Sequence, residues 1–101
     1  MSISTQKSSD GNVLTIKIQG RFDFSSHQEF RDAYESADSS ILEYHIDMSE
    51  TTYLDSSALG MLLLLRDFAG GDNAQITIFN CNSDVHQILT ISNFEQLFKI
   101  Q

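Results

Sequence analysis

Segments with the two-residue period of a strand alternate along this chain with segments that have the 3.6-residue period of a helix, and this limits the fold more than any other feature. In residues 13–19, for example, Leu14, Ile16 and Ile18 share one face while polar side chains occupy the other. Such alternation implies a sheet with parallel strand pairs, onto which the crossover helices pack. The sequence therefore predicts an α/β fold with a mixed sheet of about five strands, in the order strand, strand, helix, strand, helix, strand, helix, strand.

Turn and capping signals set the bounds of these elements. Ser26 and Glu29 have the spacing of a capping box, Ser83 is expected to cap the third helix, and the glycines at 70–71 end the second. The expected strands are residues 2–8, 13–19, 43–48 and 75–79, and the tail 94–100 is apolar enough to dock as a last turn or a short strand. The expected helices are residues 26–37, residues 55–68 and one that begins at residue 83.

Length and composition favour one domain, residues 1–101, because a chain of this size with 41% apolar residues can form a single core. The net charge is −8, with only six Lys and Arg residues, so we expect no direct binding to nucleic acid. A single cysteine permits no internal disulfide and fits a reducing compartment. No secretory signal and no apolar run of membrane-spanning length occurs, so we expect a soluble, cytoplasmic protein without membrane insertion.

Motifs for metals, cofactors and catalysis are missing from the sequence. The histidines, His27, His45 and His86, lie too far apart in sequence to have metal-ligand spacing with one another or with Cys81. No glycine-rich phosphate loop and no nucleophile elbow is present. We therefore expect no metal, no cofactor and no enzymatic activity, and an enzyme or nucleotide-binding domain remains as an alternative that a nucleotide titration would test.

The segment YLDSSALGMLLLLRD, residues 53–67, places an acid and two hydroxyls directly before an apolar helix. Asp55 is a favourable N-cap residue, so that Ser56 and Ser57 occupy the first two helical positions. One capping residue is enough to begin a helix, and the second hydroxyl is then free for another purpose. The alternative is that these three residues do nothing more than cap a core helix.

This helix has two apolar sides. Gly60 is unfavourable inside a helix by about 1 kcal/mol relative to alanine, and its benefit would be open access one turn from Ser57. Exposed apolar surface beside a modifiable hydroxyl indicates a docking surface for a macromolecule. The inner side, expected to face the sheet, consists of Ala58, Leu62, Leu65 and Ala69. The outer side consists of Ser57, Gly60, Met61, Leu64 and Phe68.

The longer segment TTYLDSSALGMLLLLRD resembles the signature of STAS domains, in particular the bacterial anti-sigma factor antagonists, in which a strand end leads into D-S-[ST]-G-[LI]-G and an apolar helix. GRFDF, residues 20–24, is similar to the turn after the second strand of that family, and ISNFEQLFKI, residues 91–100, is similar to its C-terminal ending. The resemblance covers nearly the whole chain and implies a single STAS-type domain.

The resemblance also implies where the chain is modified. The family is phosphorylated on the second hydroxyl residue of the pair, which corresponds to Ser57, with Ser56 as the second choice. Asp55 precedes the pair, and Asp23 corresponds to a loop aspartate near the site. Ala58 stands where the family usually has glycine, and this difference would alter how closely a partner approaches.

Asp23 has two interpretations. An aspartate directly after a strand often forms a turn, whereas the resemblance places Asp23 in a loop that contacts the partner, together with Phe24 and Ser25. The expected partner-binding residues are Asp23, Phe24, Ser25, Asp55, Ser56, Ser57, Gly60, Met61 and Leu64.

The function that the resemblance implies is a partner switch. The unphosphorylated protein would bind an anti-sigma factor, usually also a serine kinase with the histidine-kinase-like ATPase fold, and so free the sigma factor. Phosphorylation at Ser57 would end the complex, and a serine phosphatase of the metal-dependent type would restore it. The alternative is a STAS adaptor subunit of a membrane transport complex, of the lipid-transport ATPase type, that is not phosphorylated.

Overall fold

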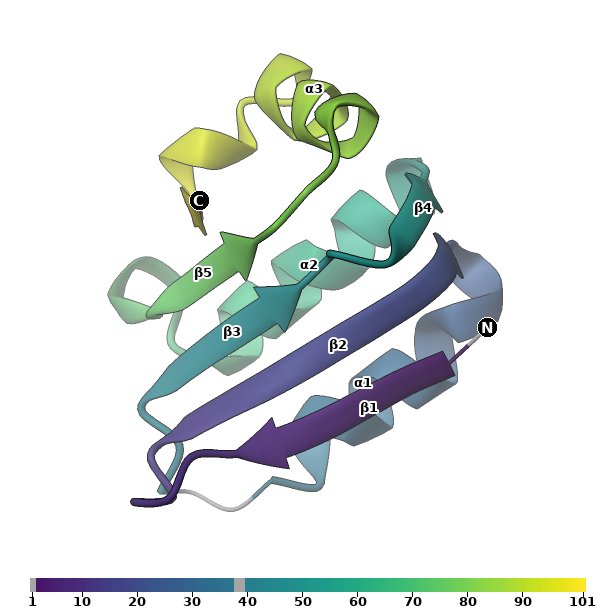
Figure 1. Ribbon diagram of the computed structural model, residues 1–101. Coiled ribbons are helices and arrows are strands. Elements are labelled where there is room, and N and C mark those ends of the chain that lie inside the picture. Colours follow the sequence, from purple (N-terminus) through teal and green to yellow (C-terminus); the bar gives the residue numbers. More distant parts are fainter. Residues whose placement is uncertain (1, 38–39) are drawn as a thin grey trace.

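The computed structural model describes residues 2–37 and 40–101 of the chain, and it confirms an α/β fold with a mixed sheet (Figure 1). The strands in this part of the chain are β1 (Ser2–Lys7), β2 (Val13–Phe22), β3 (Glu43–Asp47), β4 (Thr51–Leu54), β5 (Ile76–Phe79) and β6 (Lys99–Ile100). The α-helices are α1 (His27–Glu35), α2 (Ser56–Phe68) and α3 (Ser83–Ile91). Short 3-10 helices occur at η1 (Phe24–Ser26), η2 (Gly71–Asn73) and η3 (Phe94–Gln96).

The sheet has the order β1-β2-β3-β5-β6, and β4 pairs with the end of β2. Strand β1 is antiparallel to β2, and the other described pairs are parallel. Strand β2 is long enough for two neighbours, since its first part pairs with β3 and its residues from Gly20 onward pair with β4. At Gly20 the backbone φ is +81°, which glycine adopts without strain, and the register shifts between Gly20 and Arg21. This shift brings the end of β2 beside β4.

The core lies between the sheet and the helices α1 and α2, which are behind the sheet in Figure 1. Leu14, Ile16 and Ile18 are buried, as their alternation predicts. The apolar row continues across the sheet, because Ile16 pairs with Ile46 and Ile46 with Ile78. Among the buried residues of the helices are Phe30, Tyr34, Ala58, Leu62, Leu65, Val85 and Leu89.

Strand β4 is missing from the order that the sequence predicts. Its segment TTYL does not alternate, because Thr51 and Leu54 are buried while the two residues between them are exposed. Buried positions three residues apart do not have the period of a strand. The strand is defined by its tertiary contacts instead: β4 pairs with β2, and the buried Thr51 hydroxyl donates to the carbonyl of Ile18 at 2.8 Å.

The predicted cap of α3 is wrong by one residue. Asn82 is the N-cap, and its Oδ1 accepts a hydrogen bond of 2.8 Å from the backbone N–H of Val85. Ser83 is the first residue of the helix. The side-chain amide of Asn82 also donates to the carbonyl of Thr51 at 3.1 Å, so a single residue both caps α3 and ties it to β4.

The predicted capping box of α1 is also wrong. Ser26 precedes the helix but makes no capping hydrogen bond with its side chain. Glu29 does not reach back to the helix start, because its Oε2 accepts from the backbone N–H of Ile3 on β1 at 3.3 Å. The 3-10 helix η1 leads directly into α1, which leaves Ser26 inside a continuous stretch of helical backbone.

Ser26→Ala is expected to raise the free energy of unfolding by about 1 kcal/mol. The Ser26 side chain is fully buried, and its hydroxyl has no hydrogen-bond partner among the residues that the structure describes. Such a hydroxyl carries its desolvation cost without compensation. Urea unfolding followed by circular dichroism measures the change, with Ser56→Ala at an exposed position as the control. A clear loss of stability for Ser26→Ala would contradict this prediction.

Candidate functional site

Two aspartates follow the parallel strands β2 and β4 at the point where both strands end. Arg21 of β2 pairs with Tyr53 of β4, and the pairing continues to the last residue of each strand. Asp23 and Asp55 come next, both with extended backbones, at φ −139° and −125°. Because neighbouring strands lie about 4.8 Å apart, the two carboxylates emerge close together at one edge of the sheet.

Asp55 is the N-cap of α2, as the sequence predicts. Its Oδ1 accepts from the backbone N–H of Ala58 at 3.0 Å and from the hydroxyl of Ser57 at 2.6 Å. The Ser57 hydroxyl bond is the main cause that lowers the pKa of Asp55, and the charge of Asp23 acts in the opposite direction. Ser57 is half-buried and is part of the cap, whereas Ser56 is exposed.

Asp23 has the same arrangement at the end of β2. Its Oδ1 accepts from the hydroxyl of Ser25 at 2.5 Å and from the backbone N–H of Ser25 at 3.0 Å. These bonds, the hydroxyl bond first, lower the pKa of Asp23. Asp23 therefore forms a turn and caps η1, and the same geometry places it beside Asp55 in the candidate site.

Arg21 and Tyr53 belong to this site, although the sequence alone did not indicate either of them. The Cζ atom of Arg21 lies 4.1 Å from the centroid of the Tyr53 ring, within the range of a cation–π contact. The Nε atom of Arg21 lies 3.4 Å from Oδ2 of Asp23. The register of β2 against β4 brings these residues together, and it could be inferred only once β4 was known.

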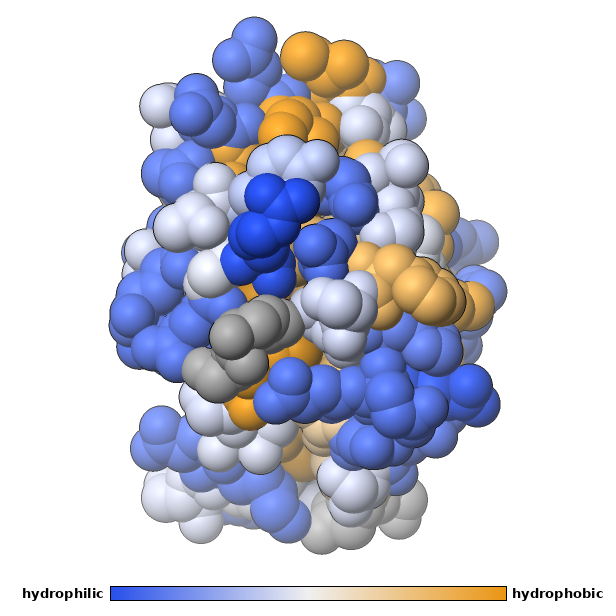
Figure 2. All heavy atoms as spheres, turned by 90° about the vertical axis from the view of Figure 1, so that its right-hand side faces the viewer, coloured by the Kyte–Doolittle hydropathy of each residue, from blue (hydrophilic) through white to orange (hydrophobic). Residues whose placement is uncertain are grey.

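The surface where these strands end is hydrophilic, with separate apolar patches between the polar residues (Figure 2). Phe24, directly after Asp23, is 66% exposed, and its ring stacks on His27 with centroids 5.0 Å apart. Gly60, one turn along α2 from Ser57, is exposed, and a Cβ atom added there would meet nothing within 4 Å. The exposed Phe24 ring and the open space at Gly60 are therefore accessible to a macromolecule that approaches Ser57.

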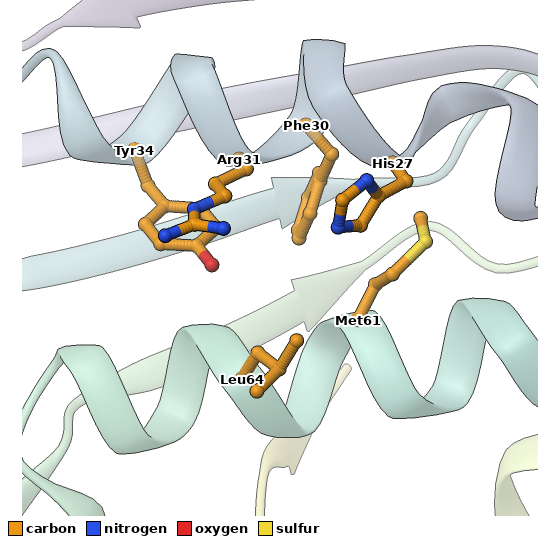
Figure 3. A pocket seen from close by; sticks show the side chains of 6 residues that line it. All are labelled: His27, Phe30, Arg31, Tyr34, Met61 and Leu64. Carbon is orange, nitrogen blue, oxygen red and sulfur yellow. The ribbon is translucent and has the colours of Figure 1, made fainter.

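Met61 does not lie on an exposed docking surface, so this part of the prediction is wrong. The residue is only 5% exposed, because α1 packs beside α2 and covers it. Figure 3 shows the Met61 side chain directed from α2 toward α1. The spacing of apolar residues along α2 could not reveal this, since it depends on where another helix lies. The residues around it in the figure are His27, Phe30, Arg31, Tyr34 and Leu64.

Leu64 and Phe68 are the most exposed large apolar residues of α2, and Leu63 is exposed to a smaller extent. The exposed fractions of Leu64 and Phe68 are 53% and 51%. Both residues line a groove of about 190 Å³ between α1 and α2, and Arg31 and Glu35, which form an ion pair of 2.9 Å, also line it. The full lining is Arg31, Tyr34, Glu35, Leu64 and Phe68.

Residues 2–37 and 40–101 contain neither a metal-binding cluster nor a membrane-spanning helix. No cluster of three side chains in this part of the chain could hold a metal ion. None of its helices combines the length and the apolar character that a bilayer crossing requires.

The family model described as "Mlab, STAS domain" matches residues 5–100. A STAS-domain containing protein of Pseudomonas aeruginosa (strain UCBPP-PA14) is 63% identical over 100 residues, which is 99% of either chain.

Solved structures share the fold at much lower identity. The anti-sigma factor antagonist SpoIIAA of Bacillus matches in its unphosphorylated form with a TM-score of 0.71 and 11% identity, over 99% of this chain and 87% of that one. Its phosphorylated form matches with a TM-score of 0.66 and 11% identity, over 99% and 91%. A sulfate transporter family protein of Wolinella succinogenes matches with a TM-score of 0.74 and 12% identity, over 93% and 80%.

Proposed function

The chain belongs to the STAS-domain family, and on this basis we propose that it is a cytoplasmic anti-sigma factor antagonist that works by partner switching. The unphosphorylated form binds an anti-sigma factor with serine kinase activity and the histidine-kinase-like ATPase fold, and the sigma factor is released. Phosphorylation of Ser57 ends this complex, and a serine phosphatase of the metal-dependent type restores the binding form. STAS domains of the antagonist type are generally binding domains rather than enzymes.

The hydrogen bond of 2.6 Å from the Ser57 hydroxyl to Asp55, next to Asp23, is the observation that carries this proposal. A phosphoryl group on the Ser57 oxygen removes this donor and adds a charge of about −1.5 to −2 beside two carboxylates. A partner shaped for the bare hydroxyl would then have to bury a dianion for which its own surface offers no counterion. A penalty of about 3–4 kcal/mol, reasonable for such a group, weakens binding about a hundredfold to a thousandfold.

The helix itself tolerates this charge. The first turn of α2 offers free backbone amides and the positive end of the helix dipole. Its inner side is anchored, since Ala58, Leu62 and Leu65 are buried. The resemblance of the chain to SpoIIAA in both its unphosphorylated and its phosphorylated form supports a modification that changes the surface and keeps the fold.

Mass spectrometry of the protein purified from its own cells tests the proposal. We expect a population that is heavier by about 80 Da, the mass of one phosphoryl group, with fragment ions that place it on Ser57. Modification of Ser56 alone would contradict the residue assignment. A protein that stays unmodified when it is incubated with ATP and an extract of the same cells would contradict the switch.

Asp23→Ala is expected to weaken binding to the anti-sigma factor about tenfold, with a loss of stability of about 1 kcal/mol or less. The reason is that Asp23 is part of the surface around Ser57 as well as the cap of η1. Asp10→Ala is a matched control, because Asp10 accepts from the Ser8 hydroxyl and from a backbone N–H in a similar turn between β1 and β2. Calorimetric titration and thermal melting separate the two effects. If Asp23→Ala and Asp10→Ala bound the anti-sigma factor with equal affinity, the role of Asp23 would be structural only.

The adaptor function is a second candidate because one protein with this fold is a sulfate transporter family protein. An adaptor of a membrane transport complex, for example of the lipid-transport ATPase type, would use the same domain without phosphorylation. Affinity capture from cell extract with the unphosphorylated protein as bait distinguishes the two functions. The adaptor function predicts a transport ATPase subunit among the captured proteins, whereas partner switching predicts an ATP-binding kinase.

A further inference from the structure

Arg21 is the cationic side chain that the pairing of β2 with β4 brings to the candidate site. Its guanidinium lies over the Tyr53 ring at 4.1 Å and 3.4 Å from Asp23. The Arg21 side chain is 63% exposed, so these contacts hold it only loosely. Asp23 does not depend on Arg21 alone, because its other carboxylate oxygen accepts the two hydrogen bonds from Ser25.

The remaining cations of the chain lie elsewhere. Lys17 pairs with Glu50, Arg31 with Glu35 and Arg66 with Asp72, while Lys7 ends β1 and Lys99 begins β6. The titratable groups that the neighbouring elements bring toward the Ser57 end of α2 include Asp23 from the end of β2, Tyr53 and Asp55 from the end of β4, and His27 from the start of α1. Within the described residues, the charged groups linked to Ser57 are the carboxylates of Asp55 and Asp23 and, through Asp23, the guanidinium of Arg21, while the His27 imidazole stands at the start of α1.

We propose that Arg21 responds to the phosphate: when Ser57 is phosphorylated, the guanidinium leaves Asp23 and Tyr53 and pairs with the phosphate. This inference rests on the proposed phosphorylation of Ser57. Arg21 contacts Asp23, the charge of Asp23 acts on Asp55 across the strand ends, and Asp55 accepts the hydrogen bond of the Ser57 hydroxyl. A guanidinium pairs with a phosphate through two parallel hydrogen bonds, and a dianion attracts it more strongly than a carboxylate does.

This movement would make the two forms of the protein differ in more than one group. In the bare form Arg21 offsets the charge of Asp23 and covers part of the Tyr53 ring. In the phosphorylated form Asp23 loses its cation and the ring is uncovered. A partner that docks over the ends of β2 and β4 would meet a changed surface at both strands. Arg21 is thus a positioning residue that extends the effect of the phosphate beyond Ser57.

The pKa of the phosphate, measured by ³¹P NMR titration, tests the pairing. Phosphoserine is installed at position 57 during translation, so the experiment does not depend on a kinase. A paired guanidinium favours the dianion, and Arg21→Gln is therefore expected to raise the phosphate pKa, ordinarily about 6, by about half a unit to one unit. Arg21→Lys should raise the phosphate pKa less, because lysine keeps the positive charge but lacks the planar guanidinium that forms two parallel hydrogen bonds. Arg31→Gln, which removes an exposed cation of α1, should leave it unchanged.

The outcomes separate this inference from the proposed function. A phosphate pKa that is the same in Arg21→Gln and in the unsubstituted protein would overturn the role of Arg21. An equal shift in Arg31→Gln would also overturn it, since the effect would then be one of net charge. Failure of the proposed function appears in a different experiment, as equal binding of the bare and phosphorylated proteins to the anti-sigma factor, whatever the titration shows.

Discussion

Ser57→Asp is expected to weaken binding to the anti-sigma factor about a hundredfold while the fold stays intact. The new carboxylate takes the place of the hydroxyl that donates to Asp55 at 2.6 Å, so a donor is lost and a third negative charge joins Asp23 and Asp55. A partner that closes over this surface would have to bury that charge without a counterion. Calorimetric titration gives the affinity, and far-ultraviolet circular dichroism checks the fold. The helix end should accept the carboxylate, because anions are favourable near a helix N-terminus.

Two further substitutions sharpen this experiment. Ser56→Asp adds the same charge one residue earlier, at an exposed position outside the cap, and should weaken binding much less. Ser57→Ala removes the phosphate acceptor without adding charge, so it should bind permanently and resist phosphorylation. If Ser56→Asp weakened binding as much as Ser57→Asp, the effect would come from net charge and the assignment of Ser57 would be wrong.

Gly60→Gln is expected to weaken binding at least tenfold and at the same time to stabilise the fold. A Cβ atom at Gly60 meets nothing within 4 Å, and the residue lies inside α2, where glycine costs about 1 kcal/mol relative to alanine. The longer side chain would stand one turn from Ser57, where a partner has to approach. Opposite signs for stability and binding would show that the glycine serves access and not folding.

Gly60→Ala and Thr90→Gln are the controls for this prediction. The alanine variant should gain a similar stability but lose little affinity, because its side chain is short. Thr90 is exposed on α3, where a glutamine should leave binding unchanged. Urea unfolding and calorimetric titration measure the two quantities. Unchanged affinity for Gly60→Gln would place the partner elsewhere on the surface.

Local sequence signals predicted the parts of this molecule that depend on neighbouring residues. The alternation of Leu14, Ile16 and Ile18 marked the buried face of β2, because side chains alternate along any strand. Asp55 was correctly predicted as the cap of α2, since the capping bond reaches only three residues along the chain. A role for Ser57 beyond the cap stays a prediction, and the structure shows that its hydroxyl donates to the capping residue Asp55.

Contacts between segments that are far apart in the sequence could not be predicted from these local signals. The apolar spacing of α2 places Met61 and Leu64 on the same outer side of the helix. However, α1 covers Met61 and leaves Leu64 exposed. Strand β4 forms because the end of β2 lies beside it, and its own four residues carry no strand period. Arg21 and Tyr53 are therefore neighbours only in the folded chain. The part of the site that the sequence missed is the part built by this strand pair.

The affinities of the bare and phosphorylated proteins for one partner test the central claim most directly. The bare protein, used as bait in an extract of its own cells, identifies the anti-sigma factor, and calorimetry then compares it with protein that carries phosphoserine at position 57. We predict that the bare protein binds about a hundredfold to a thousandfold more tightly. Equal affinities would contradict the account, because Ser57 would then not control binding.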